Sequence, residues 1–176
     1  MRIRLLCALL ACSLFTLGAH AAGAALKVGD RAPAFALQGS DGKLHRLSDY
    51  AGRAVVIAWF PRAFTSGCTV ECKSLAANSR KLRAYAVSYF MASVDPLADN
   101  KRFAESANAD FPLLSDPSKA TARTYGVLNA AGFANRHTIY IGKDGRITAI
   151  DTKVVPATSA EDMLLRLDAL GVPKQR

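Results

Sequence analysis

The chain has 176 residues, and its 23 Lys and Arg against 14 Asp and Glu give a net charge of +9. This length is enough for one domain with its own core and excludes two. No nucleic-acid-binding motif accompanies the basic surplus, so we expect solvated helix faces and no nucleic-acid partner.

The first 21 residues have the pattern of a secretory signal peptide. A basic start precedes the uncharged apolar stretch 5–17, and the Ala-His-Ala triplet at 19–21 matches a cleavage site. The apolar run is shorter than the roughly 20 residues that span a bilayer, which argues against a membrane anchor. We therefore expect residues 22–176 to form a single exported, periplasmic domain; lipoprotein processing at Cys12 is the alternative.

Downstream of this leader, hydrophobic patterning predicts alternating strands and helices. Asp41-Gly42 and Lys143-Asp144-Gly145 are turn signals that each join two short strands into a hairpin. We expect a turn region at 111–116. We expect strands at 35–37, 44–47, 54–60, 87–94, 137–141 and 146–150, and helices at 68–84, 97–108, 159–170 and in a short segment ending at Tyr125. A βαβ unit followed by a hairpin predicts an α/β, thioredoxin-like fold: a mixed central β-sheet flanked by helices, with an N-terminal β-hairpin.

Cys68 follows the apolar strand 54–60 through a loop and stands at the start of a predicted helix. Unpaired N–H groups and the positive dipole end of a helix N-terminus lower a thiol pKa from about 8.5 toward neutrality. Once the leader is removed, Cys68 and Cys72 are the remaining cysteines. One pair so close in sequence cannot stabilise a small fold as a disulfide framework would. We therefore expect Cys68 to be a reactive thiolate.

The loop before this cysteine reads Pro61-x-x-x-Thr65-x-x-Cys68, which resembles the active-site loop of peroxiredoxins, the cysteine-dependent thiol peroxidases. The bacterioferritin-comigratory, or Q-type, group is the best fit. Further similar stretches lie at 28–35, 93–95, 103–104, 111–116, 125–127 and 136–141. The resemblance implies a thioredoxin-like antioxidant enzyme that reduces hydrogen peroxide and organic hydroperoxides through a cysteine sulfenic acid, with no cofactor and no metal.

The resemblance also assigns roles to four residues. The Cys68 thiolate would attack the terminal peroxide oxygen, giving Cys–SOH and water or an alcohol. Arg136 would stabilise this thiolate and hydrogen-bond the peroxide oxygens. Thr65 would hydrogen-bond the same atoms, and Pro61 would shield the site from water. Each residue taken singly also fits a structural role, as a helix cap, a surface arginine or an inert buried cysteine; their combination in family order favours catalysis.

Cys72 departs from the Q-type pattern, in which the second cysteine usually lies one residue farther along. Side chains at i and i+4 of a helix have Cβ atoms roughly 5–6 Å apart, whereas a disulfide needs roughly 3.5–4.5 Å. A Cys68–Cys72 bond therefore requires the first helical turn to unwind. Either Cys72 resolves the sulfenic acid in this way, or it is a buried apolar residue and an external thiol resolves Cys68.

The Cys68-x-x-x-Cys72 spacing leaves two other thioredoxin-like functions open. Sco-type copper chaperones carry this spacing with a distant His, which His137 could supply, and thiolates with imidazole suit copper. A thiol–disulfide oxidoreductase acting on proteins is expected to carry Cys-x-x-Cys instead. For the peroxidase we expect a hydroperoxide substrate, an exported thioredoxin-like or small-thiol reductant, no stable membrane insertion, and a monomer or weak homodimer.

Overall fold

The computed structural model describes residues 26–175, so the predicted signal peptide at 1–21 lies outside the described residues. Within this range seven strands form one open sheet in the order β2-β1-β5-β4-β3-β6-β7. The strands are β1 Ala36–Gly39, β2 Leu44–Arg46, β3 Ala54–Trp59, β4 Val87–Ser93, β5 Leu113–Ser115, β6 His137–Ile141 and β7 Ile147–Asp151. The helices are the 3-10 turn η1 Leu47–Tyr50, α1 Ser66–Ala77, α2 Ser79–Leu82, α3 Leu97–Ser106, α4 Ala120–Thr124 and α5 Ser159–Ala169.

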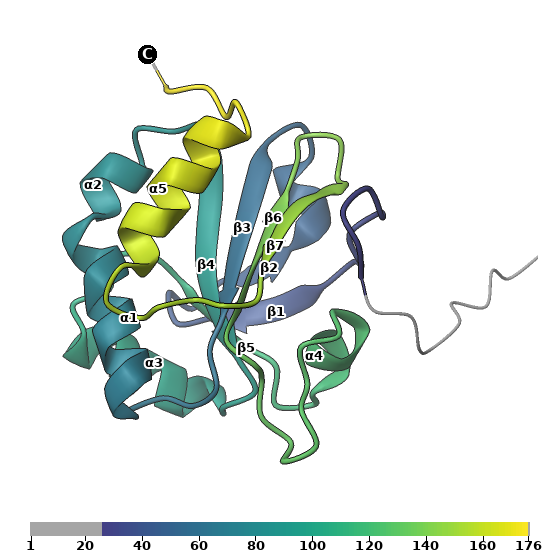
Figure 1. Ribbon diagram of the computed structural model, residues 1–176. Helices are drawn as coiled ribbons and strands as arrows, with labels where there is room; N and C mark the ends of the chain where they lie inside the picture. The colour runs from purple at the N-terminus through teal and green to yellow at the C-terminus, as the bar shows by residue number, and fades with distance from the viewer. Residues whose placement is uncertain (1–25, 176) are drawn as a thin grey trace, which may run out of the picture.

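The sheet is mixed, as the order of elements predicts. The central strands β3, β4 and β5 run parallel, because helical crossovers connect them, while β6 and β7 add antiparallel strands at one edge and the β1–β2 hairpin at the other. Figure 1 shows α1, α2, α3 and α5 on one side of the sheet and α4 on the other. The predicted α/β architecture with an N-terminal hairpin is confirmed.

Strand β3 shows why its sequence is an uninterrupted apolar run. Successive side chains of a strand point to opposite faces, and here both faces are covered by helices. Val56 and Ala58 belong to the core cluster beneath α1, α3 and α5, whereas Val55, Ile57 and Trp59 belong to the cluster on the opposite face. This double burial anchors the end of β3, from which the Cys68 loop departs.

Two expectations from the sequence are wrong in detail. The segment expected to be a turn region contains β5, which pairs parallel to β4 and antiparallel to β1. Three residues after a proline carry no alternating pattern, so only these long-range pairings reveal the strand. The helix expected at 68–84 begins at Ser66 and is interrupted at Asn78, whose side-chain amide donates to the Ser74 carbonyl at 3.1 Å and competes with helical continuation.

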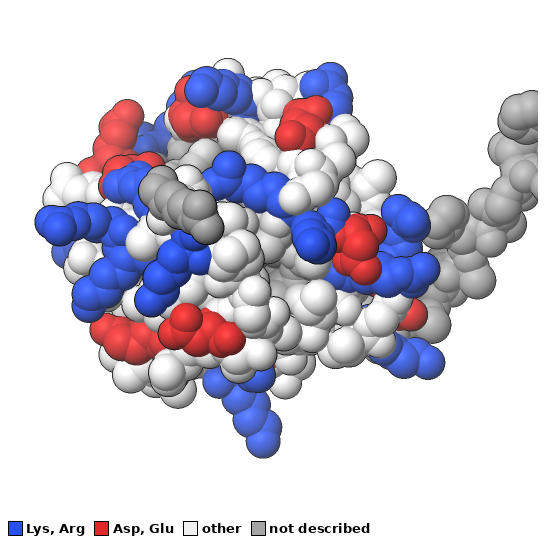
Figure 2. All heavy atoms as spheres, turned by 90° about the horizontal axis from the view of Figure 1, so that it is seen from above, with Lys and Arg blue, Asp and Glu red and all other residues white. Residues whose placement is uncertain are grey.

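The surface carries the positive charge expected from the composition. In the view from above in Figure 2, Lys and Arg side chains outnumber Asp and Glu, and the two kinds are interspersed. Among the described residues, no helix is both long enough and apolar enough to cross a bilayer.

Candidate active site

Cys68 is the third residue of α1, directly beyond the loop that leaves β3. This loop is tied to the sheet because the Ala63 N–H donates to the buried Asp95 carboxylate at 2.8 Å. Thr65 occupies the N-cap position of α1, and its carbonyl accepts the Thr69 N–H at 2.9 Å. The nucleophile candidate therefore lies in the first helical turn, where free N–H groups favour a negative charge.

Arg136 reaches Cys68 because of the pairing between β3 and β6. In this antiparallel register His137 lies opposite Trp59, so the residue just before β6 lies beside the loop just after β3. The Arg136 Nη2 donates to the Cys68 Sγ at 3.2 Å. Gly67 permits this approach, since a Cβ at that position would lie 3.3 Å from Nη2. A fixed guanidinium next to the sulfur stabilises the thiolate form.

Glu71 completes this site and was not predicted from the sequence. It lies one helical turn after Cys68, and its Oε2 accepts a hydrogen bond from Arg136 Nη1. Its side chain is only 1% exposed, and its Oε1 has no hydrogen-bond partner within the described residues. Burial raises the pKa of Glu71 to about 7, although the charge of Arg136 opposes this shift. The i, i+3 spacing from Cys68 was the available signal, because such residues share a helix face.

Arg136 consequently binds two groups at once. Burial opposes its charge, but the neighbouring Glu71 and Cys68 raise its pKa, so it remains a cation. Its guanidinium fork contacts a sulfur with one nitrogen and a carboxylate oxygen with the other. Because the guanidinium is planar and held at both nitrogens, its remaining N–H groups point in fixed directions. A lysine ammonium could not be held in this way.

Cys72 lies one turn further along α1 than Cys68. Both cysteines are fully buried and neither forms a disulfide. Burial, with smaller contributions from Glu71 and Cys68, raises the pKa of the Cys72 thiol to about 12. Cys72 is therefore a protonated thiol at neutral pH, inside an intact helix.

The remaining predicted site residues occupy the loop, and neither forms a hydrogen bond with the sulfur. Thr65 is exposed, and its hydroxyl donates to the Arg62 carbonyl at 3.0 Å rather than to Cys68. Pro61 is half-buried directly after β3. Of the four residues with predicted catalytic roles, the structure thus brings together Cys68 and Arg136, while the roles of Thr65 and Pro61 stay predictions.

The structure does not assemble the copper site that the alternative interpretation requires. Within residues 26–175 no three or more His, Cys, Asp and Glu side chains cluster in a way that could hold a metal ion. His137 is half-buried, and burial lowers the pKa of its imidazole.

Comparison with known proteins shows the family to which the chain belongs. The AhpC/TSA family model matches residues 28–150. The chain belongs to this family of peroxiredoxins. Peroxiredoxin Bcp of Escherichia coli K12 is 34% identical over 129 residues, covering 69% of this chain and 83% of the relative. Alkyl hydroperoxide reductase E of Mycobacterium bovis is 34% identical over 150 residues, covering 83% of this chain and 97% of the relative.

The fold of this peroxiredoxin agrees with the same group. The crystal structure of peroxidoxin BcpB from Mycobacterium tuberculosis superposes with a TM-score of 0.74 at 28% identity, covering 82% of this chain and 97% of the other. The resemblance to peroxiredoxins of the bacterioferritin-comigratory group and the thioredoxin-like fold are confirmed. The chain is therefore a thiol-dependent peroxidase. Membership of this family favours peroxide reduction over copper transfer and over disulfide exchange with other proteins.

Proposed function

We propose that this peroxiredoxin reduces hydrogen peroxide and organic hydroperoxides through a Cys68 sulfenic acid, as an antioxidant in an exported compartment. The contact between Arg136 Nη2 and Cys68 Sγ at 3.2 Å carries this proposal, because it places a permanent cation where a thiolate and a peroxide must meet. The name of the Mycobacterium bovis relative, an alkyl hydroperoxide reductase, supports organic hydroperoxides as substrates.

In the first step the Cys68 thiolate donates an electron pair to the terminal peroxide oxygen. The S–O bond forms as the O–O bond breaks, and the leaving hydroxide or alkoxide takes up a proton and departs as water or an alcohol. Negative charge moves from sulfur to the leaving oxygen, and the Arg136 guanidinium stabilises both positions. Thr65 would join this set of donors if its hydroxyl turned from the Arg62 carbonyl toward the peroxide.

In the second step a thiol attacks the sulfur of Cys68–SOH, forming a disulfide and releasing water. We propose that Cys72 supplies this thiol after the first turn of α1 unwinds. The need for unwinding follows from its complete burial, its raised pKa and the i, i+4 spacing of the two cysteines. Unwinding also exposes Cys72 to water, which restores a more ordinary thiol acidity.

The compartment and the reductant are further parts of the proposal. The signal-peptide pattern of residues 1–21 supports export to the periplasm, where an exported thioredoxin-like protein or a small thiol would reduce the disulfide. We propose a monomer or weak homodimer.

Peroxide consumption by the purified chain with dithiothreitol tests the activity. We expect wild type to consume hydrogen peroxide and cumene hydroperoxide, and Cys68→Ser to lose turnover of both while keeping its circular dichroism spectrum, since a serine hydroxyl is far less acidic than a thiol. The exposed residue Arg80 offers a control, because Arg80→Gln changes the charge of α2 and should not alter the rate. More than a few per cent of wild-type activity in Cys68→Ser would exclude Cys68 as the nucleophile.

A further inference from the structure

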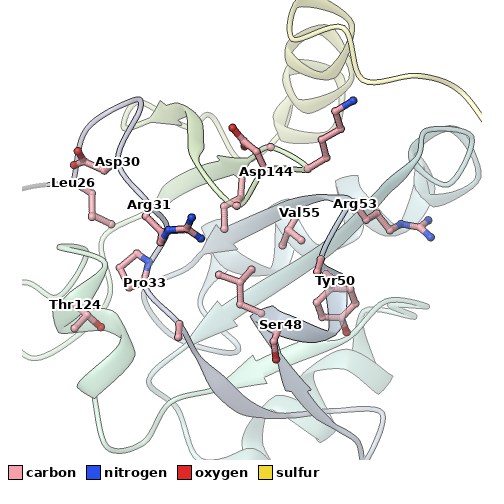
Figure 3. A pocket seen from close by; sticks show the side chains of 18 of the residues that line it. Leu26, Asp30, Arg31, Pro33, Ser48, Tyr50, Arg53, Val55, Thr124 and Asp144 are labelled. Atoms are coloured by element: carbon pink, nitrogen blue, oxygen red, sulfur yellow. The ribbon is translucent and has the colours of Figure 1, made fainter. Parts of the chain in front are cut away.

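A groove of about 1120 Å³ lies at the end of the sheet opposite to Cys68. The segment 30–34, the η1 region and the turn between β6 and β7 form its walls (Figure 3). The β3–β6 register defines its distance from the active site: Val55 and Ile141 line the groove as one pair, while Trp59 and His137 form the pair next to the active site. Four residues of strand separate the two pairs by about 13 Å. The peroxidase mechanism therefore does not use this groove.

Aliphatic side chains form much of the groove lining. Pro33 precedes β1, Leu47 belongs to η1 and Val55 to β3. Leu26 lies at one end of the groove (Figure 3). Tyr50 also lines the groove, but its hydroxyl is hydrogen-bonded to His45 Nδ1 at 2.5 Å. A lining in which aliphatic side chains predominate suits an alkyl chain better than a nucleobase.

The charges around this lining favour an anion. Four basic residues line the groove against two acidic ones, and the acidic groups already accept main-chain hydrogen bonds: Asp30 from the Lys27 N–H at 2.9 Å and Asp144 from the Arg146 N–H at 3.1 Å. The basic residues are Arg31, Arg53, Arg123 and Lys143. A ligand with one negative charge would therefore complement the groove.

Arg31 is the basic side chain best placed to bind that charge. Figure 3 shows its guanidinium extending over the groove, whereas Arg53 points away from it and donates to the Val87 carbonyl at 3.3 Å. Arg31 Nη1 lies over the turn between β6 and β7, 3.7 Å from where a Cβ on Gly145 would be. Within residues 26–175 the Arg31 guanidinium forms no ion pair.

The backbone around Arg31 is held rigidly, so the groove is formed before any ligand arrives. Arg31 forms an isolated antiparallel bridge with Arg146. On either side of it, the Ala32 N–H donates to the Gly145 carbonyl at 2.9 Å and the Ile147 N–H donates to the Asp30 carbonyl at 2.9 Å. Preorganisation of this kind lowers the entropy lost on binding.

We propose that this groove binds the anion of an unbranched fatty acid, with the carboxylate on Arg31 and the alkyl chain along Leu26, Pro33 and Leu47, above the buried Val55. The carboxylate would receive charge-assisted N–H bonds from the guanidinium, and each methylene would leave water for an aliphatic surface. Binding is independent of the peroxidase proposal, because neither cysteine takes part.

Isothermal titration of the full chain with octanoate, decanoate and dodecanoate below their micelle concentrations tests the proposal. Burial of about 0.8 kcal/mol per methylene predicts up to about fourfold tighter binding for each added carbon. Arg31→Gln should weaken dodecanoate binding by at least about tenfold, because a charged hydrogen-bonding partner is lost. Arg80→Gln removes the same charge from the exposed surface of α2, outside the groove, and should bind dodecanoate as wild type does.

Each other outcome would overturn the proposal. Equal weakening by Arg31→Gln and Arg80→Gln would indicate general charge attraction, and affinity independent of chain length would exclude the aliphatic lining as a binding surface. Binding to phosphatidylglycerol vesicles without binding of the free acids would assign the groove to a lipid surface. Failure of all three acids to bind the wild-type chain would leave the groove without this ligand, whatever the peroxidase assay shows.

Discussion

Arg136 and the buried Glu71 form a partly buried ion pair beside the Cys68 sulfur, although 65 residues separate them in the sequence. The pair fixes the guanidinium from behind, so that its second nitrogen faces the thiolate. The Glu71 carboxylate is nevertheless short of hydrogen bonds, because its Oε1 lacks a partner within the described residues. Burial raises the pKa of Glu71 to about 7. Arg136 is therefore positioned by Glu71, a carboxylate whose charged form is destabilised by burial.

Replacement of Arg136 tests the geometry of the fork separately from its charge. Arg136→Lys keeps a cation but cannot contact Glu71 and Cys68 at the same time, so we expect kcat/KM for peroxide to fall about 10- to 100-fold. Arg136→Met removes the charge, so its kcat/KM should fall further, and iodoacetamide should alkylate its Cys68 more slowly than that of wild type at the same pH. Equal rates for Arg136→Lys and wild type would show that only the charge matters.

Glu71→Gln tests the cost of the buried carboxylate. The folded-state pKa of Glu71 is raised above its ordinary value of 4.5, so the protein gains from the protonated form below pH 4.5 and loses this stability as the pH rises through about 7. The loss is on the order of 3 kcal/mol in the free energy of unfolding. Between pH 4.5 and 7.5 the urea midpoint of wild type should fall relative to that of Glu71→Gln. Parallel midpoints across this range would contradict the raised pKa.

Cys72 is expected to be unreactive in the reduced protein and reactive after oxidation. Its pKa of about 12 leaves almost no thiolate at pH 8, so iodoacetamide should leave Cys72 unmodified until the chain is denatured. After one equivalent of peroxide, tryptic mass spectrometry should find a Cys68–Cys72 disulfide, and Cys72→Ser should proceed to sulfinic acid more readily.

The same disulfide should be visible in amide exchange. Because it cannot form within an intact helix, amide hydrogens of residues 66–76 should exchange faster in the oxidised form than in the reduced form. Accumulation of Cys68 sulfenic acid with Cys72 still open to alkylation after denaturation would make this a one-cysteine enzyme.

Gly67→Ala tests the stability of α1 separately from the placement of Arg136 beside Cys68. Alanine is preferred to glycine within a helix by up to about 1 kcal/mol, so the melting temperature should hold or rise. The new Cβ would lie 3.3 Å from Arg136 Nη2 and 3.7 Å from Pro156, which displaces the guanidinium by a few tenths of an ångström. We expect kcat/KM to drop about tenfold, since catalysis depends on this alignment. A variant with both higher stability and full activity would show that Arg136 has room to adjust.

The place of Cys68 in the first turn of a helix and the central strands could be predicted from the sequence because their signals are local. The double-faced apolar run of β3, the loop Pro61-x-x-x-Thr65-x-x-Cys68 and the helix after it are neighbours in the chain, and steric and dipole effects act over that short range. Arg136 was reached through family resemblance, since a single arginine before a strand has no distinctive pattern of its own.

Only the tertiary structure decided the features that depend on residues distant in the sequence: strand β5, the contact between Arg136 and Cys68, and the burial of Glu71. Strand β5 exists because β4 and β1 supply hydrogen-bonding edges on either side of three residues, and the antiparallel register of β3 with β6 brings Arg136 to the first turn of α1. Packing of this turn against the sheet then removes Glu71 from water and raises its pKa. The burial and the charge partners of a residue depend on neighbours that only the folded chain brings together. A sequence pattern can therefore indicate which residues carry the chemistry, but not how far their surroundings shift the pKa of each group.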